Sequence, residues 1–294
     1  MPLTRSNQKP KHNWQFEAIG TGWSIETPRE LDETIKDLIG GQIETFDKTY
    51  SRFRDDSLVA RIAEEPGTYE FPDNIVGLID LYYQLYDATN GAVTPLIGDR
   101  LSALGYDKDY SFTPRETKRV MSWGEVMQWD GRKVKTSQQI TLDFGAAGKG
   151  YLVDEVAKVL EINDVTDYVI DASGDIRCRS SATQRVGLEN PDDPSMVIGV
   201  VDIQNASLCA SATNRRRWGN GLHHVIDGRT GEPTNEIVAT WVIADSTALA
   251  DGLATALFFV PPNSLTQLGQ FQFVRLFADV HVEYSHDFVG QLFV

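Results

Sequence analysis

The chain has 294 residues, and 41% of them are hydrophobic, so it can bury one large core or two smaller ones. Its formal net charge of −15 would make a nucleic acid or an anionic membrane surface repel it as a whole. The sequence holds neither an apolar run long enough to span a membrane nor an apolar leader. Its two cysteines, Cys178 and Cys209, are too few for a disulfide framework. We therefore expect a cytoplasmic protein with no nucleic-acid partner and no transmembrane segment.

The first half of the chain is rich in helical patterns. Residues 1–13 are polar and predict a flexible tail, and residues 14–294 predict a single domain without repeats. Apolar residues recur at helical spacing between residues 28 and 53, with Gly40 and Gly41 as a weak point. The other predictions are a strand over 14–27 kinked at Gly20 and Gly22, a helix over 72–89, a loop over 92–107, a short helix over 113–123 and paired strands over 134–144.

The second half is rich in short strand patterns. After a helix that begins near Lys149, strands are predicted over 167–172, 175–180, 185–189, 195–203, 206–212 and 271–278, interrupted by one helix over 247–260. Helices cluster first and strands later, without a regular alternation of strand and helix. This order predicts the α+β class, with mostly antiparallel sheets and packed helices rather than a doubly wound parallel sheet.

The stretch DFGAAGKGYLVDE, which begins at Asp143, joins an apolar segment to a helix through small residues and one lysine, Lys149. Small residues let the backbone turn sharply and present N–H groups at a helix N-terminus, which favours an anion such as phosphate. A lysine would add a full positive charge. The spacing matches neither the P-loop nor the dinucleotide-binding pattern. A simple strand-to-helix connection with Lys149 in solvent explains the same residues.

The stretch STALADGLATALFF places Asp251 and Thr255 four residues apart on a predicted helix, and therefore on one face of it. A carboxylate and a hydroxyl can hold Mg²⁺, which takes oxygen ligands and completes its shell with water and substrate phosphates. A backbone carbonyl would be a third ligand. The alternatives are an exposed aspartate and a packed threonine. An aspartate in so apolar a helix would be costly to bury without a partner.

A third cluster, SATNRRRWGNGLHHVIDGRTGEP, holds the densest basic run of the chain, Arg215 to Arg217, followed by His223 and His224. Adjacent residues on a strand point to opposite faces, so at most one of the two histidines is expected to face a cleft. Two histidines without further well-spaced ligands do not predict a zinc site. For the arginines, a solvated run is the preferred interpretation.

Taken together, these segments resemble the ApbE family of FAD:protein FMN transferases, in the family's order and over most of the chain. The segments that carry the resemblance are GT at Gly20, SRFRDDS at Ser51, GAVTP at Gly91, DFGAAGKGYLVD at Asp143, SGDI at Ser173, HVIDGRTG at His224 and ADGLATA at Ala250. The fourth of these is similar to the family's hallmark DLGGIAKGYxVD, whose lysine corresponds to Lys149.

The resemblance implies an architecture related to the T-fold and a magnesium-dependent reaction. In that reaction the pyrophosphate of FAD is cleaved, FMN is attached to a threonine hydroxyl of an acceptor flavoprotein, and AMP leaves. FAD is then a substrate, Mg²⁺ the cofactor and the acceptor flavoprotein the partner.

The resemblance also implies roles for particular residues. The metal ligands are Asp251, Thr255 and the backbone carbonyl of Gly148, which agrees with the argument from the helix face. His224 accepts the proton of the incoming hydroxyl, a task that suits its ordinary pKa of about 6.5. Lys149 and Asp251 are the other catalytic residues. The positions implied to bind FAD are Gly20, Thr21, Gly145, Gly148, Lys149, Gly150, Ser211, Asp227 and Thr230. We expect Lys149 and the N–H groups around Gly148 and Gly150 to hold the phosphates.

The chain departs from the family pattern at several positions. Thr94 stands where Asp is usual, Gly228 where Pro is usual, Ser173 where Gly is usual and Ala63 where Asn is frequent. Two alternative functions therefore stay open. One is a flavin-binding or carrier protein that keeps the FAD site without transferase activity, and the other is an FAD pyrophosphate hydrolase in which water replaces threonine.

Overall fold

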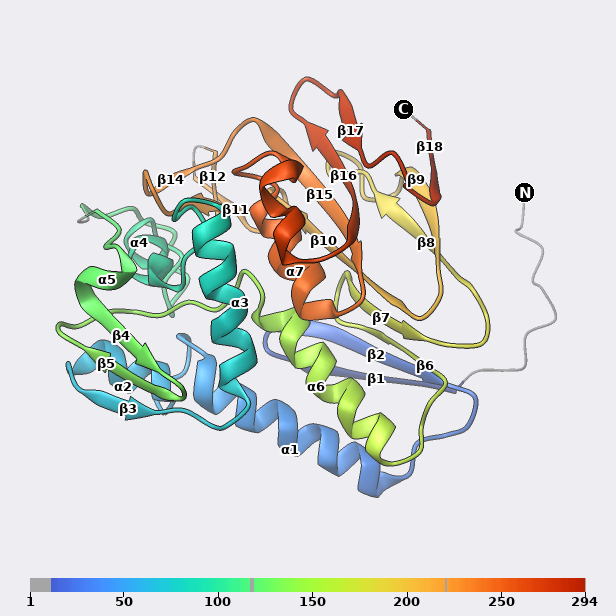
Figure 1. Ribbon diagram of the computed structural model, residues 1–294, viewed down its shortest axis with the longest axis horizontal. Coiled ribbons are helices and arrows are strands. Elements are labelled where there is room, and N and C mark those ends of the chain that lie inside the picture. Colours follow the sequence, from blue (N-terminus) through green and yellow to red (C-terminus); the bar gives the residue numbers. More distant parts are fainter. Residues whose placement is uncertain (1–11, 117–118, 220, 294) are drawn as a thin grey trace.

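The structure of the protein is a computed structural model that describes residues 12–116, 119–219 and 221–293 (Figure 1). Its centre is an eight-stranded sheet with the strand order β1-β2-β6-β7-β10-β15-β16-β17, in which each neighbouring pair is antiparallel. These strands are β1 (His12–Ala18), β2 (Thr21–Thr27), β6 (Tyr168–Asp171), β7 (Asp175–Arg179), β10 (Ala206–Ala212), β15 (Ile237–Ala244), β16 (Phe271–Phe277) and β17 (Val282–Tyr284). The predicted α+β class with mostly antiparallel sheets is confirmed.

Helices cover one face of this sheet. They are α1 (Glu33–Tyr50), α3 (Ile75–Ala88), α6 (Gly148–Ile162) and α7 (Thr247–Ala256). Helices α6 and α7 lie side by side in front of the central strands (Figure 1). Their apolar side chains and those of the sheet form the larger core, in which Tyr82, Leu85, Leu152 and Leu160 are fully buried.

A smaller sheet, with the order β18-β9-β8, packs on the other face. Its strands are β8 (Gln184–Glu189), β9 (Val197–Ile203) and β18 (Gly290–Leu292). Along β10, Leu208 belongs to the core on this side and its neighbour Cys209 to the core under the helices. Trp241 and Val242 of β15 divide in the same way. This alternation is what a strand requires when both of its faces are covered.

The remaining elements are short. They are β3 (Thr68–Glu70), β4 (Met127–Asp130) and β5 (Lys133–Thr136), which form one small sheet; the hairpins β11 (Arg217–Trp218) with β12 (Leu222–His223) and β13 (Ile226–Asp227) with β14 (Glu232–Pro233); α2 (Leu58–Glu64), α4 (Gly98–Ala103) and α5 (Trp123–Val126); and the 3₁₀ helices η1 (Pro95–Ile97) and η2 (Pro262–Leu268). In the part of the chain that the structure describes, the helices are too short or too polar to cross a membrane.

The single kinked strand predicted over residues 14–27 is instead the hairpin β1–β2. Ile19 and Gly20 have φ values of 46° and 73°, and two successive positive φ values give the tight turn that reverses a chain between antiparallel strands. The helix predicted over 28–53 is α1, which begins at Glu33 because Asp32 caps it. Residues 12 and 13 of the predicted tail belong to β1, and residues 1–11 lie outside the described residues.

Between residues 92 and 144 the predictions differ from the structure in several places. The predicted loop over 92–107 contains η1 and α4. The helix predicted over 113–123 is wrong: residues 113–116 and 119–122 are not helical, and residues 117 and 118 lie outside the described residues. Helix α5 starts only at Trp123, where Ser122 and Glu125 form a capping box. Of the strands predicted over 134–144, only residues 134–136 are strand, in β5. Its partner β4 lies earlier in the chain, and residues 137–144 form no strand.

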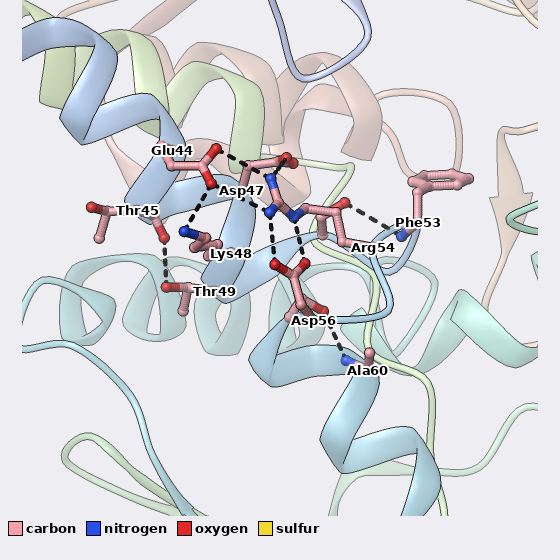
Figure 2. Close-up of polar contacts among 11 residues, drawn as sticks. Glu44, Thr45, Asp47, Lys48, Thr49, Phe53, Arg54, Asp56 and Ala60 are labelled. Atoms are coloured by element: carbon pink, nitrogen blue, oxygen red, sulfur yellow. Dashed lines mark hydrogen bonds and ion pairs between the residues drawn. The ribbon is translucent and has the colours of Figure 1, made fainter. Parts of the chain in front are cut away.

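After α1 the chain turns a corner around one arginine (Figure 2). The guanidinium of Arg54 pairs with Glu44 and Asp47 of α1 and with Asp56, just before α2. These pairs are partly exposed, so each one alone stabilises the fold little. Together they define the path of the corner, on which the side chain of Arg52 points inward and is only 3% exposed.

Gly150 allows α6 and α7 to approach each other closely. A Cβ atom at Gly150 would lie 2.3 Å from the carbonyl oxygen of Thr247 and 2.7 Å from the Cβ atom of Asp251. Gly148, at the first position of α6, has more room, because the nearest atom to its Cβ position is the Cβ of Phe144 at 3.3 Å. The two glycines of the GKG segment therefore differ in how much the packing depends on them.

We expect Gly150→Ala to lower the free energy of unfolding by about 1–3 kcal/mol, because the added methyl group overlaps the backbone of α7 and forces the helices apart. Gly148→Ala is the matched control in the same turn. Its methyl group meets only a 3.3 Å contact, and alanine is the better helix former, so little or no loss is expected. Urea unfolding followed by circular dichroism measures both values, and equal losses would contradict the close-packing role of Gly150.

Candidate active site

The predicted residues of α6 and α7 meet at the N-terminal end of α6. The carboxylate of Asp251 accepts a hydrogen bond from the backbone N–H of Gly150, with 2.9 Å between the two atoms. Asp251 is only 5% exposed, so the alternative of an exposed aspartate is wrong. One turn further along α7, the hydroxyl of Thr255 donates to the carbonyl oxygen of Ala146 at 3.2 Å. Both side chains face the same turn, as their spacing predicted.

Two oxygen atoms at this turn lie about as far apart as neighbouring ligands of a metal ion. Neighbouring ligands at about 2.1 Å from Mg²⁺ in an octahedron lie about 3 Å apart, and Thr255 Oγ1 and Ala146 O are 3.2 Å apart. The carbonyl that faces Thr255 is that of Ala146, whereas Gly148 was expected. Gly148 begins α6, and a carbonyl inside a helix points along the axis toward the N–H four residues later.

The charges buried at this end of α6 also fit a cation. Asp175 on β7 is fully buried, and its Oδ2 lies 3.1 Å from Nζ of Lys149. Burial, and then the charge of Asp175, raise the pKa of Asp251 well above its ordinary value, against the opposing effect of Lys149. Two carboxyl groups thus share one ammonium group, and a divalent cation would supply the missing positive charge.

A metal at this turn would depend on hydroxyl and carbonyl oxygens as well as on a carboxylate. Within the described ranges, no group of three or more His, Cys, Asp or Glu side chains could hold a metal ion. Mg²⁺ accepts such a mixed oxygen set and keeps several positions for water or substrate phosphate. The residues present therefore fit Mg²⁺ better than a metal that prefers nitrogen or sulfur ligands.

Lys149 does not extend into solvent. Its ammonium group donates to the carbonyl oxygen of Ala172 at 2.8 Å and lies 3.5 Å from that of Ser173, so it faces the β6–β7 turn as well as Asp175. Burial lowers the pKa of Lys149, but the charges of Asp175 and Asp251 outweigh this effect and raise it. Its side chain is 24% exposed. The alternative of a solvated lysine is therefore wrong.

The backbone N–H groups near Lys149 are already used within the chain. The N–H of Gly148 donates to the carbonyl oxygen of Phe144 at 2.8 Å, and that of Gly150 donates to Asp251. The expectation that these N–H groups hold phosphate is not supported, because they close the turn and orient the carboxylate instead. The glycines shape the site without presenting open donors.

Asp143 anchors the start of the same turn. Its Oδ1 accepts a hydrogen bond from the N–H of Gly145 at 2.7 Å, and its Oδ2 pairs with the buried Arg52. Arg52 also donates to the carbonyl oxygen of Tyr106 at 2.9 Å. The hydroxyl of Tyr82, on α3, accepts the next N–H of the turn at 3.2 Å. The turn is thus held from three directions.

The two adjacent histidines have different surroundings, but strand alternation does not apply to them, because β12 ends at His223 and His224 lies in the bend that follows. His223 is buried: its Nε2 bonds to the carbonyl oxygen of Thr234 at 2.8 Å, and its Nδ1 accepts the N–H of Val225 at 3.2 Å. Within the described chain, Nδ1 of His224 is buried without a hydrogen-bond partner. Burial, and then the charges of Arg216 and His223, lower the pKa of His224 to about 3. Its imidazole is therefore neutral near pH 7, well away from its ordinary pKa.

One of the arginines belongs to this side of the site. The guanidinium of Arg216 lies over the ring of Tyr106, with 5.5 Å between its carbon and the ring centroid, and that of Arg52 lies 4.9 Å from the same centroid. Arg215 is exposed and pairs with Glu189. Arg216 and Arg217 are exposed too, so the interpretation of the run as solvated holds for all three arginines. Arg216 also contributes positive charge next to His224.

The predicted FAD-binding residues on the strands lie on the Lys149 side. Gly20 and Thr21 form the β1–β2 turn, and the hydroxyl of Ser173 donates to the carbonyl oxygen of Gly22 at 2.9 Å. Ser211 lies on β10, which pairs with β7. A groove of about 490 Å³, lined by residues of β1, β2, β6 and the β6–β7 turn, opens beside the hairpin.

Asp227 and Thr230 lie at the turn between β13 and β14. The carboxylate of Asp227 pairs with Arg229. The N–H of Gly228 donates to the carbonyl oxygen of Ala92 at 2.9 Å. The turn that holds these two predicted residues thus packs against the GAVTP segment through Gly228, and the turn of α6 holds Gly145, Gly148, Lys149 and Gly150.

Two of the departures from the family pattern are in contact. A Cβ atom at Gly228 would lie 2.7 Å from Cγ2 of Thr94 and 2.6 Å from the carbonyl oxygen of Gly91. Thr94 is buried, and its hydroxyl accepts the N–H of Leu96 at 3.2 Å. Because Gly228 has no side chain, the methyl group of Thr94 can pack against its backbone.

The sequence matches the model of the ApbE family over residues 19–274. The chain belongs to the ApbE family. It is 24% identical over 275 residues to the FAD:protein FMN transferase of Klebsiella pneumoniae, covering 85% of this chain and 79% of that protein. It is 22% identical over 283 residues to the FAD:protein FMN transferase of Escherichia coli K12, covering 85% and 78%.

Solved structures show the same fold. The ApbE protein of Thermotoga maritima superposes with a TM-score of 0.82 at 20% identity, covering 94% of this chain and 97% of that one. The flavin transferase ApbE of Vibrio cholerae has a TM-score of 0.78 at 18% identity, covering 95% and 98%. The predicted ApbE-like architecture is therefore confirmed.

The ApbE motifs contain several residues of the site that sequence reasoning did not single out. Arg52 is the first arginine of the SRFRDDS segment, Asp143 opens the hallmark motif, and Asp175 closes the SGD triplet. A local signal was available for Asp143, which stands between Leu142 and Phe144, but the partners of all three residues lie far away in sequence. Ala146 and Tyr82 carry no such signal.

We expect Asp251→Asn to raise the melting temperature of the metal-free protein, because the amide oxygen still accepts the N–H of Gly150 while a buried charge beside Asp175 disappears. The variant should also lose any rise that Mg²⁺ gives the wild type. Thermal unfolding near neutral pH, with and without Mg²⁺, measures both effects. Asp80→Asn, at an exposed position of α3, is the control. A full Mg²⁺ response in Asp251→Asn would contradict the metal role.

Proposed function

We propose that this chain is an FAD:protein FMN transferase, the activity for which its curated relatives are named. In this reaction the hydroxyl oxygen of a threonine in an acceptor flavoprotein attacks the FMN-side phosphorus of FAD. The bond from that phosphorus to the bridging oxygen breaks, and AMP leaves with that oxygen. The observation that carries the proposal is the convergence of Asp251, Thr255 and the Ala146 carbonyl on one buried turn.

We propose that Asp251, Thr255 and the carbonyl oxygen of Ala146 hold Mg²⁺, with Ala146 in place of the Gly148 carbonyl. When bound, Mg²⁺ neutralises and aligns a diphosphate, which otherwise repels a nucleophile. The N–H of Gly150 holds Oδ2 of Asp251 and so fixes the direction of the carboxylate. The hydrogen bond between Thr255 and Ala146 fixes the other two oxygens in advance.

The other proposed roles belong to the charged groups around the turn. The Nδ1 of His224 is buried without a partner, and as a neutral imidazole it can accept the proton that the threonine hydroxyl loses. Arg216, next to His224, and Lys149, at the other end of the turn, offset the negative charge of the dinucleotide. The N–H groups of Gly148 and Gly150 are already used in hydrogen bonds within the chain. The negative charge of the dinucleotide is therefore balanced by the side chains of Arg216 and Lys149.

Incubation of the purified protein with FAD and Mg²⁺, with and without an acceptor domain that carries the target threonine, tests the function. AMP together with protein-bound flavin is the expected result. AMP with free FMN would support the hydrolase instead, and intact FAD that stays bound would support the carrier. Replacement of the acceptor threonine by valine should remove bound flavin without affecting the binding of FAD to the enzyme.

We expect protonation of His224 to cause no fall in kcat/KM for FAD between about pH 8 and about pH 5, because the pKa of His224 is about 3 and its imidazole is neutral throughout this range. Only at more acidic pH should protonation of His224 lower the rate. His224→Gln should lower kcat by about 100-fold or more, whereas His286→Gln, at an exposed position, should not. A fall centred at about pH 6.5 that is absent in His224→Gln would contradict the lowered pKa.

A further inference from the structure

Asp175 is a fully buried carboxylate to which the proposed reaction gives no role. It lies on β7 opposite Cys209 of β10, on the face of the sheet that the helices cover. In the described part of the chain, neither of its carboxylate oxygens accepts a hydrogen bond of good geometry. The group that balances its charge is the ammonium of Lys149, 3.1 Å from Oδ2. A carboxylate buried in this way is costly unless a cation stays beside it.

Lys149 is held on one side of the turn by three acceptors. Two are the carbonyl oxygens of Ala172 and Ser173, to which its ammonium group donates, and the third is the carboxylate of Asp175, with which it forms an ion pair; all come from the β6–β7 strands and their turn. Asp251, on α7, is a second carboxyl group whose charge acts on the same ammonium. The ammonium group of Lys149 could therefore pair with either carboxyl group, and in the structure it pairs with that of Asp175.

The position of Lys149 matters because a cation paired with Asp251 would compete with a metal ion. The net charge of Lys149, Asp175 and Asp251, with both carboxyl groups ionised, is −1. Removal of the charge on Asp175 makes this sum zero and frees the ammonium to move to Asp251. Both changes act against the binding of a divalent cation.

We infer that Asp175 is a positioning residue that holds Lys149 on the β6–β7 side and thereby keeps the Asp251 carboxylate available to a divalent cation. This inference rests on the metal site of the proposed function. Asp175 touches neither the metal ligands nor the substrate in this account, and it acts through Lys149 and through its own charge.

The test is the affinity of the full-length protein for Mn²⁺ in the absence of FAD. Mn²⁺ stands in for Mg²⁺ because it takes the same oxygen ligands, and free Mn²⁺ can be quantified by electron paramagnetic resonance. Asp175→Asn should raise the Kd for Mn²⁺ by about tenfold or more. The double variant Asp175→Asn/Lys149→Met restores the sum of −1 and removes the competing ammonium, so its Kd should return close to that of the wild type.

Asp171→Asn is the matched control. Asp171 lies at the end of β6, and its Oδ1 accepts the N–H of Gly174 at 2.9 Å, a bond that asparagine can keep. Its Kd for Mn²⁺ should stay within about twofold of the wild type. If Asp175 had only a structural role, the loss of Mn²⁺ affinity in Asp175→Asn would not be reversed by the additional substitution Lys149→Met.

Each outcome decides between the two ideas. A wild type that binds no Mn²⁺ would overturn the metal site itself, and the inference with it. A wild type that binds Mn²⁺, with Asp175→Asn within twofold of it or with no recovery in the double variant, would overturn the inference and leave the proposed function standing. If Asp175→Asn does not fold, Lys149→Met alone decides, because it should bind Mn²⁺ more tightly than the wild type, and an unchanged or higher Kd would overturn the inference.

Discussion

The hydrogen bond from the N–H of Gly150 to the carboxylate of Asp251 joins α6 to α7 across 101 residues of sequence, and the geometry of the site depends on it. Any residue except proline would supply the backbone donor, but only glycine, which has no Cβ, lets Thr247 and Asp251 come close enough to use it. Thr255 lies one turn further along α7, on the same face as Asp251, and donates to the carbonyl oxygen of Ala146. A preformed set of oxygens then costs little rearrangement when a ligand binds.

Three charged side chains lie near this contact in otherwise apolar surroundings. They are Asp251 of α7, Lys149 of α6 and Asp175 of β7, and the other buried residues of the two helices are mostly apolar. Such groups destabilise a fold unless they are balanced, and the core around them is large enough to offset that cost. The chain is strongly acidic overall, yet Arg52, Arg216 and Lys149 all surround this one turn. Local positive charge of this kind can receive an anionic substrate that the protein surface as a whole would repel.

Local periodicity predicted the helix face of Asp251 and Thr255, because two residues four apart meet on a helix whatever surrounds them. The family resemblance implied the carbonyl of Gly148 as the backbone ligand, whereas the carbonyl that faces Thr255 is that of Ala146, since sequence does not fix the residue at which a turn becomes a helix. Periodicity also has limits. It missed β15, which is buried on both faces and so lacks a clean alternation of apolar and polar residues. The pair of Arg52 and Asp143 spans 91 residues, a distance at which no local pattern carries information.

The close contact between Gly228 and Thr94 means that the residues allowed at these two distant positions depend on each other. A proline ring at position 228 would press on the methyl group of Thr94 and on the backbone of Gly91, where even one added carbon has no room. The residue at 228 can therefore change only together with the residue at 94 or with the path of the loop. A chimera that replaced only one of the two segments would therefore lose the fit between the loop and the hairpin, so the two segments must be exchanged together.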